Sequence, residues 1–170
     1  PSVLLLHGWE SCSGRWHSYF NDLRDAGFDL YAFDGPAQGR SSGKEFSVML
    51  YAAILGRFLE KTGILPDYWI GHSAGGMAAI YYLSKLKGPA RPEKLVLLGV
   101  PGELNDFVDK FANVLRVHDR VRRAIEHEFV RKHQLHFADV SFIEMAKDLE
   151  MSGLVLHDKD DDLAPFIGAK

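Results

Sequence analysis

The chain has 170 residues, the usual length of one domain and enough to bury a hydrophobic core. It carries 20 lysines and arginines against 23 aspartates and glutamates, and a net charge of −3 is too mild for a protein that binds nucleic acid by neutralising phosphates. No apolar run approaches the roughly 20 residues that cross a bilayer, which excludes a membrane span. Cys12 is the only cysteine, so one chain can form neither a disulfide framework nor a thiolate zinc cluster.

Short apolar runs alternate along the chain with segments of helical length. Five runs have the near-continuous apolar character of strands buried on both faces: residues 2–6, 30–33, 68–70, 94–98 and 153–156. Helices are predicted at residues 16–26, 48–61 and 77–87, and a glycine lies close beyond each end. This alternation is typical of an α/β fold, a mostly parallel sheet with helices on both faces.

Residues 103–150 contain only helical patterns. Five apolar residues share one helical face, namely Leu104, Phe107, Val108, Phe111 and Leu115, and a second face follows at Val121, Ile125 and Phe129. The sequence Ser141-Phe142-Ile143-Glu144 predicts a capping box that opens a third, short helix. Because roughly 45 residues exceed a normal connection, we expect a helical cap insertion at approximately 103–150, over one edge of the sheet.

Both ends of the sequence are abrupt. Residues 1–6 enter a strand pattern with no initiator methionine and no basic leader, and the sequence stops at Lys170, a few residues into a new segment. We therefore expect residues 1–170 to form a single, partial domain of a longer protein.

The segment Gly71-His72-Ser73-Ala74-Gly75 matches the pattern G-x-S-x-G. It directly follows the predicted strand at 68–70 and precedes the helix at 77–87, which is the setting of a nucleophile elbow. So tight a turn strains the serine backbone, needs small residues on either side and lifts the hydroxyl above the sheet edge. Ser73 is therefore the candidate nucleophile, and the alternative is a glycine-rich turn with an incidental serine.

The segment His7-Gly8-Trp9 ends the first predicted strand. Gly8 permits a turn that aims the Trp9 amide at a carbonyl oxygen, and the Ala74 amide is the second donor of the predicted oxyanion hole. His7 is assigned a structural role, because a triad of this type places its histidine last in the chain.

A third segment, Asp34-Gly35-Pro36-Ala37-Gln38-Gly39-Arg40-Ser41, follows the second strand and is given a structural role in that turn. With these three segments in this order, the chain resembles the α/β-hydrolase superfamily, over essentially its whole length and from the third family strand to the seventh. Its opening is similar to a group of cytosolic esterase-like hydrolases with a small helical lid. The resemblance implies a Ser-Asp-His triad, no cofactor, a small-molecule ester or thioester as substrate and a cytoplasmic location. It does not identify the substrate, because this fold hosts many chemistries.

The resemblance also indicates the triad acid. Residues 157–161, followed by Pro165, resemble the acid loop of the family, in which the acid lies four residues before the proline. This selects Asp161, with Asp160 as the alternative. Three aspartates here, Asp158, Asp160 and Asp162, have the spacing of a calcium loop, but Leu163 and Ala169 stand where that loop needs Gly and Glu, so no metal is expected. His133 and His136 lack a third ligand at a suitable spacing.

The third triad member is missing, because all eight histidines lie at or before His157. We expect truncation before the histidine, with a naturally inactive homologue as the second explanation. The leading hypothesis is a serine hydrolase of the carboxylesterase kind that acts on a small or medium ester or thioester. The alternative is a pseudoenzyme that binds a ligand in the same pocket without turnover. The cap's basic residues are expected to be solvated, and its aromatics (Phe107, Phe111, Phe129 and Phe137) to be packing residues, some of which could line an acyl pocket.

Overall fold

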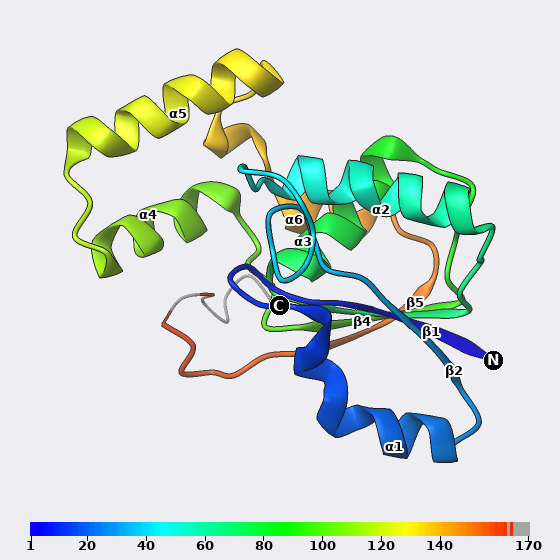
Figure 1. The fold of residues 1–170 in the computed structure, drawn as a ribbon. Coiled ribbons are helices and arrows are strands. Elements are labelled where there is room, and N and C mark those ends of the chain that lie inside the picture. Colours follow the sequence, from blue (N-terminus) through cyan, green and yellow to red (C-terminus); the bar gives the residue numbers. More distant parts are fainter. Residues whose placement is uncertain (163, 165–170) are drawn as a thin grey trace.

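The computed structural model describes residues 1–162 and residue 164. Within them, five strands form one sheet in the order β2-β1-β3-β4-β5, and every neighbouring pair is parallel (Figure 1). The strands are β1 (Ser2–Leu6), β2 (Asp29–Ala32), β3 (Tyr68–His72), β4 (Lys94–Leu98) and β5 (Ser152–Leu156). The predicted parallel sheet is confirmed, and no strand end differs from its prediction by more than two residues.

Helices connect these strands. The first half contains η1 (Ser13–Trp16), α1 (His17–Asp25), α2 (Val48–Thr62), α3 (Ala74–Tyr81) and the π-helical turn η2 (Tyr82–Leu86). The second half contains α4 (Leu104–Val114), α5 (Asp119–His133), η3 (Phe137–Asp139) and α6 (Phe142–Lys147). Helix α3 begins three residues before its predicted start, because Gly75 and Gly76 belong to the helix and not to the preceding turn.

Helices cover both faces of the sheet, as predicted. The larger core lies on one face, where Leu4, Leu6 and Trp69 are fully buried beneath α2 and α3. The alternate residues of β1, Val3 and Leu5, pack with Trp16 on the opposite face, which α1 covers (Figure 1). This follows from the strand pleat, in which successive side chains point to opposite faces.

Strand β5 differs from the prediction of a strand buried on both faces. It lies at the edge of the sheet, and its apolar residues Leu154, Val155 and Leu156 are 46–53% exposed. Its apolar run therefore reflects the propensity of these residues for β-structure and not burial within the part of the chain that the structure describes. In the same residues, no helix is both long and apolar enough to span a membrane.

The segment between β4 and β5 is helical, as predicted, but only part of it projects from the sheet. Helices α4 and α5 lie beyond the ends at which the strands terminate, whereas α6 packs against α3 (Figure 1). Phe142 is 1% exposed and Met145 is 6% exposed, so both belong to the main core. The third helix is thus a part of the helical layer and not of a cap, because its apolar residues face α3.

The two ends of this projecting segment meet at a stem beside β4. The amide of Phe142 donates to the carbonyl of Gly102 at 2.8 Å, and Glu103 and Ser141 form an isolated antiparallel bridge. The Ser141 hydroxyl accepts from the Glu144 amide at 3.2 Å, as the predicted capping residue, and donates to the Glu103 carboxylate at 2.7 Å. The stem therefore fixes where α4 leaves the sheet and where the chain returns.

Candidate active site

Ser73 lies at the tight turn between β3 and α3, and its backbone is strained. Its φ of 49° and ψ of −121° are outside the regions that residues with a side chain normally adopt, as predicted. The turn is held on both sides, because the Ser73 amide donates to the carbonyl of Leu98 at 2.9 Å and the Ser73 carbonyl accepts from the amide of Met77 at 3.0 Å. Strand β4 and helix α3 together hold the serine in this conformation.

Two glycines allow the backbones around this turn to approach one another. A Cβ atom on Gly71 would lie 2.5 Å from the Cα of Gly76. A Cβ atom on Gly75 would lie 2.4 Å from the carbonyl oxygen of Leu6, at the end of β1. Both distances are far inside van der Waals contact, so only glycine permits α3 to start directly against β1 and β3.

Trp9 and Ala74 lie on either side of this turn. A Cβ atom on Gly8 would be 3.2 Å from the Cβ of Ser73, which brings the loop after β1 against the serine. Ala74 is the first residue of α3, and the amides of a first helical turn have no partner within their own helix. Both residues line the same cavity, so the two amides that the sequence indicated as oxyanion donors belong to segments that meet at one place.

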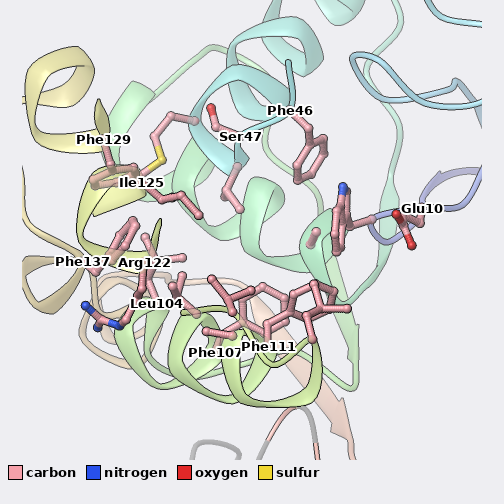
Figure 2. A pocket seen from close by; sticks show the side chains of 18 of the residues that line it. Glu10, Phe46, Ser47, Leu104, Phe107, Phe111, Arg122, Ile125, Phe129 and Phe137 are labelled. Atoms are coloured by element: carbon pink, nitrogen blue, oxygen red, sulfur yellow. The ribbon is translucent and has the colours of Figure 1, made fainter. Parts of the chain in front are cut away.

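That cavity has a volume of about 690 Å³ and opens between the sheet edge and helices α4 and α5. It reaches the Ser73 turn at Ala74, although Ser73 is not itself among the lining residues. All four aromatic residues singled out in the insertion line it, so the alternative interpretation of Phe107, Phe111, Phe129 and Phe137 as pocket residues is confirmed (Figure 2).

The cavity has a second wall that the sequence does not predict. The stretch before and at the start of α2 contributes Lys44, Phe46, Ser47, Val48 and Met49 to the lining. The available signal was local: Ser47 caps α2 by accepting from the Leu50 amide at 3.1 Å, and an aromatic residue precedes it. That signal predicts the start of a helix but not which cavity the helix faces.

Asp161 lies at the same edge of the sheet as Ser73. A Cβ atom built on Gly99 would lie 3.8 Å from the Oδ2 of Asp161. Gly99 directly follows Leu98, whose carbonyl accepts from the Ser73 amide. The Oδ1 of Asp161 accepts from the Ala164 amide at 2.8 Å, and the Asp161 side chain is 28% exposed. Asp160 is exposed, and its amide donates to the carboxylate of Asp158 at 3.0 Å. The family's proline, Pro165, and the calcium-loop positions 163 and 169 lie outside the described residues.

Two histidines lie near this edge: His7 uses both ring nitrogens in hydrogen bonds, and burial keeps His72 neutral. His7 is completely buried; its Nδ1 bonds to the Gly8 carbonyl at 2.7 Å and its Nε2 accepts from the Gly35 amide at 2.8 Å, which is the structural role predicted for it. Burial lowers the pKa of His72 to about 4, with a further contribution from Arg15, so its imidazole is neutral. His72 shares the β3 face of Ile70, which belongs to the smaller core, and this face is opposite to that of α3.

Of the other histidines, His157 lies beside Asp161, and His133 and His136 belong to the insertion. The Nε2 of His157 bonds to the Ala164 carbonyl and lies 3.9 Å from Oδ2 of Asp161. In the insertion, the His133 ring packs on Phe129 with centroids 4.7 Å apart, and His136 lies 3.7 Å from Glu126. Across residues 1–162 and 164, no group of three or more histidine, cysteine, aspartate or glutamate side chains could hold a metal ion.

The insertion has a run of basic residues at positions 116, 120, 122, 123, 131 and 132, and of these Arg122 lines the cavity. It joins α5 to α4 through an ion pair with Asp109 and a 3.0 Å bond to the amide oxygen of Asn105. It also pairs with Glu126 at 3.0 Å, and these bonds to Asp109 and Glu126 raise its pKa. The expectation of a purely solvated run is therefore wrong for Arg122, which connects the two helices that form the cavity wall.

Residues 1–149 match the family model described as alpha/beta hydrolase fold. The chain belongs to this family. Among the curated relatives of this alpha/beta hydrolase, it is 41% identical over 101 residues to a Mycoplasma pneumoniae protein named esterase/lipase 3, covering 57% of this chain and 35% of the relative. It is 31% identical over 113 residues to a monoacylglycerol lipase of Mycolicibacterium smegmatis, covering 62% of this chain and 40% of the relative. The chain thus spans between 35% and 40% of the length of these two relatives.

Solved structures extend the likeness to nearly the whole chain. The monoacylglycerol lipase of Paleococcus ferrophilus has a TM-score of 0.68 and 26% identity, covering 99% of this chain and 77% of that one. A bromoperoxidase of Bacillus anthracis has a TM-score of 0.73 at 20% identity, covering 98% and 76%. The second likeness concerns the fold alone, and together they agree with the fold that the sequence predicted.

Proposed function

We propose that the protein is a serine hydrolase that cleaves a carboxylic ester or thioester through an acyl-enzyme at Ser73. The observation that carries this proposal is the strained Ser73 turn, which adjoins a largely apolar cavity that Trp9 and Ala74 line. Backbone strain of this kind is retained where the surrounding structure enforces it, commonly at functional sites. The names of the relatives, esterase/lipase and monoacylglycerol lipase, support the same class of reaction.

In the proposed mechanism, the Ser73 hydroxyl oxygen attacks the substrate carbonyl and loses its proton to a histidine. The amides of Trp9 and Ala74 stabilise the negative charge that forms on the carbonyl oxygen, and Asp161 orients the histidine. The histidine then protonates the leaving alcohol or thiol, and water hydrolyses the acyl-enzyme. The position of Asp161 beside Gly99, next to the Leu98 carbonyl that binds the Ser73 amide, supports its role over that of Asp160.

The base in this proposal is a histidine of the whole protein that follows Asp161 in sequence. His7 uses both ring nitrogens in hydrogen bonds, and His72 faces away from α3. This chain spans only 35% to 40% of the length of the two curated relatives, which supports a base outside residues 1–170. The same missing histidine favours a second candidate, a pseudoenzyme that binds a ligand in the cavity without turnover.

Labelling of the full-length protein with a fluorophosphonate probe separates the two candidates, because the probe reacts with an activated serine and not with a mere binding site. We expect labelling of the natural protein and of Ser18→Ala, a control at an exposed serine of α1 on the opposite face. Ser73→Ala should lose the label and the esterase activity with an almost unchanged melting temperature, since it removes one hydroxyl from a turn. A natural protein that folds but takes no label would contradict the hydrolase and leave the pseudoenzyme.

A further inference from the structure

The lining of the cavity indicates a more specific class of substrate. We propose that it holds one linear, uncharged acyl chain, and that Phe129 and Phe137 form an end wall that limits the length of this chain. The inference rests on the proposed function, because it takes the acyl group to be attached at Ser73.

The cavity has a reactive end and a far end. Trp9 and Ala74 lie at the reactive end, beside the Ser73 turn. Figure 2 shows Glu10, the neighbour of Trp9, on one side of the cavity and the labelled Phe129 and Phe137 on the opposite side. An acyl group attached at Ser73 would therefore enter at Trp9 and extend toward the two phenylalanines.

The end wall has support behind it. The rings of Phe129 and Phe137 are in contact, with centroids 4.7 Å apart. Phe137 is only 3% exposed and belongs to the main core, and the outer Phe129 packs on the ring of His133. Packed core residues have little room to move, so a chain that reaches this wall has no space to continue.

The lining favours an aliphatic chain without charge. Most lining side chains are aromatic or aliphatic. The polar ones are Gln38 and Ser47, and three charged residues adjoin the cavity: Glu10, Lys44 and Arg122. Figure 2 shows the carboxylate of Glu10 and the guanidinium of Arg122 directed away from the apolar side chains, and Lys44 is exposed. Arg122 is also occupied by Asp109 and Glu126. A carboxylate or phosphate among the apolar side chains would lose its water without gaining a charged partner there.

These features predict a defined dependence on chain length. A volume of about 690 Å³ is within the range of small-molecule sites, and each methylene moved from water into an apolar site improves kcat/KM about fourfold. The gain should continue with each added methylene until the chain meets the end wall, and then reverse.

The test uses the full-length protein and a series of p-nitrophenyl esters: acetate, butyrate, octanoate, laurate and palmitate. Phe129→Ala should move the optimum of kcat/KM to a longer ester, and Ile125→Trp, which fills the same end, should move it to a shorter one. Phe20→Ala is the matched control, since Phe20 packs on the opposite face of the sheet and should leave the optimum unchanged. Circular dichroism checks that each variant folds. If Phe129→Ala does not fold, Ile125→Trp alone tests the proposal.

If neither Phe129→Ala nor Ile125→Trp changes the ester length with the highest kcat/KM, the proposal of an end wall is wrong. Failure of the proposed function gives a different result, which is a natural protein with no ester turnover and no fluorophosphonate label. In that event, isothermal titration with the uncharged methyl esters of the same chain lengths tests the inference alone. A length limit on binding that Phe129→Ala moves and Phe20→Ala does not would support the end wall, and binding without any length limit would overturn it.

Discussion

Because α3 approaches β1 closely, the site has no room for a side chain at Gly75. In Gly75→Ala the new Cβ would lie 2.4 Å from the carbonyl oxygen of Leu6 and 2.6 Å from that of His7. Both are backbone atoms within the sheet or directly after it, so α3 would have to move away by more than half an ångström to reach even a tight contact. Overpacking of this kind costs about 1–3 kcal/mol, which corresponds to a fall in melting temperature of roughly 2–12 °C for a domain of this size.

The displacement should also reduce activity, because Ser73 and Ala74 move with α3 while Trp9 stays with β1. We therefore expect Gly75→Ala to label with fluorophosphonate more slowly than its loss of stability explains, measured well below its melting temperature. Gly14→Ala is the matched control: its nearest neighbour is the Cys12 sulfur at 3.5 Å, an ordinary contact, and its melting temperature should change little. Equal melting temperatures and equal labelling rates in the two variants would refute the argument that the approach of α3 to β1 holds the serine.

Two further predictions concern the surroundings of the site. Because burial lowers the pKa of His72 to about 4, the unfolded chain binds a proton near pH 6.5 that the folded chain refuses, so stability should fall as the pH drops from 6.5 toward 4, by at most roughly 1.4 kcal/mol per pH unit. His72→Gln should reduce this slope in urea unfolding measured at several pH values, and an unchanged slope would contradict the assignment. Arg122→Met should weaken the contact of α4 with α5 by about 1–2 kcal/mol and speed hydrogen exchange in both helices, whereas Arg131→Met, which loses an exposed pair with Glu128, should not. Equal exchange in these two variants would show that Arg122 does not hold the wall.

The fold was predictable from the sequence because its signals are local. Buried parallel strands are short apolar runs, and the turn at Ser73 requires glycines at fixed positions around it, as at Gly71 and Gly75. The prediction was wrong where a residue's environment depends on distant parts of the chain. The sequence pattern places Phe142 in a cap, yet this residue is buried against α3, and the apolar strand β5 is exposed at the sheet edge.

The candidate site was predictable to a smaller extent. Ser73, Trp9 and Ala74 follow from the ends of strands that meet at one edge, which topology alone brings together. The choice of Asp161 over Asp160 depended on resemblance to a family, because adjacent carboxylates in a loop carry no periodicity that separates them. The contribution of Phe46 and Met49 to the cavity could not be predicted, since the sequence does not show which face of α2 meets the insertion.

The contacts that hold the insertion in place determine how substitutions within it affect the cavity. The stem at Glu103 and Ser141 fixes α4 at the sheet, and Arg122 joins α4 to α5. At the other end of α5, Lys132 pairs with Glu45 at 2.5 Å, within the stretch that forms the second wall. The width of the cavity therefore depends on hydrogen bonds and ion pairs at its rim, whereas its length depends on the ring pair of Phe129 with Phe137. Substitutions at the rim should change how readily all substrates enter, and substitutions in the ring pair should change which chain length is preferred.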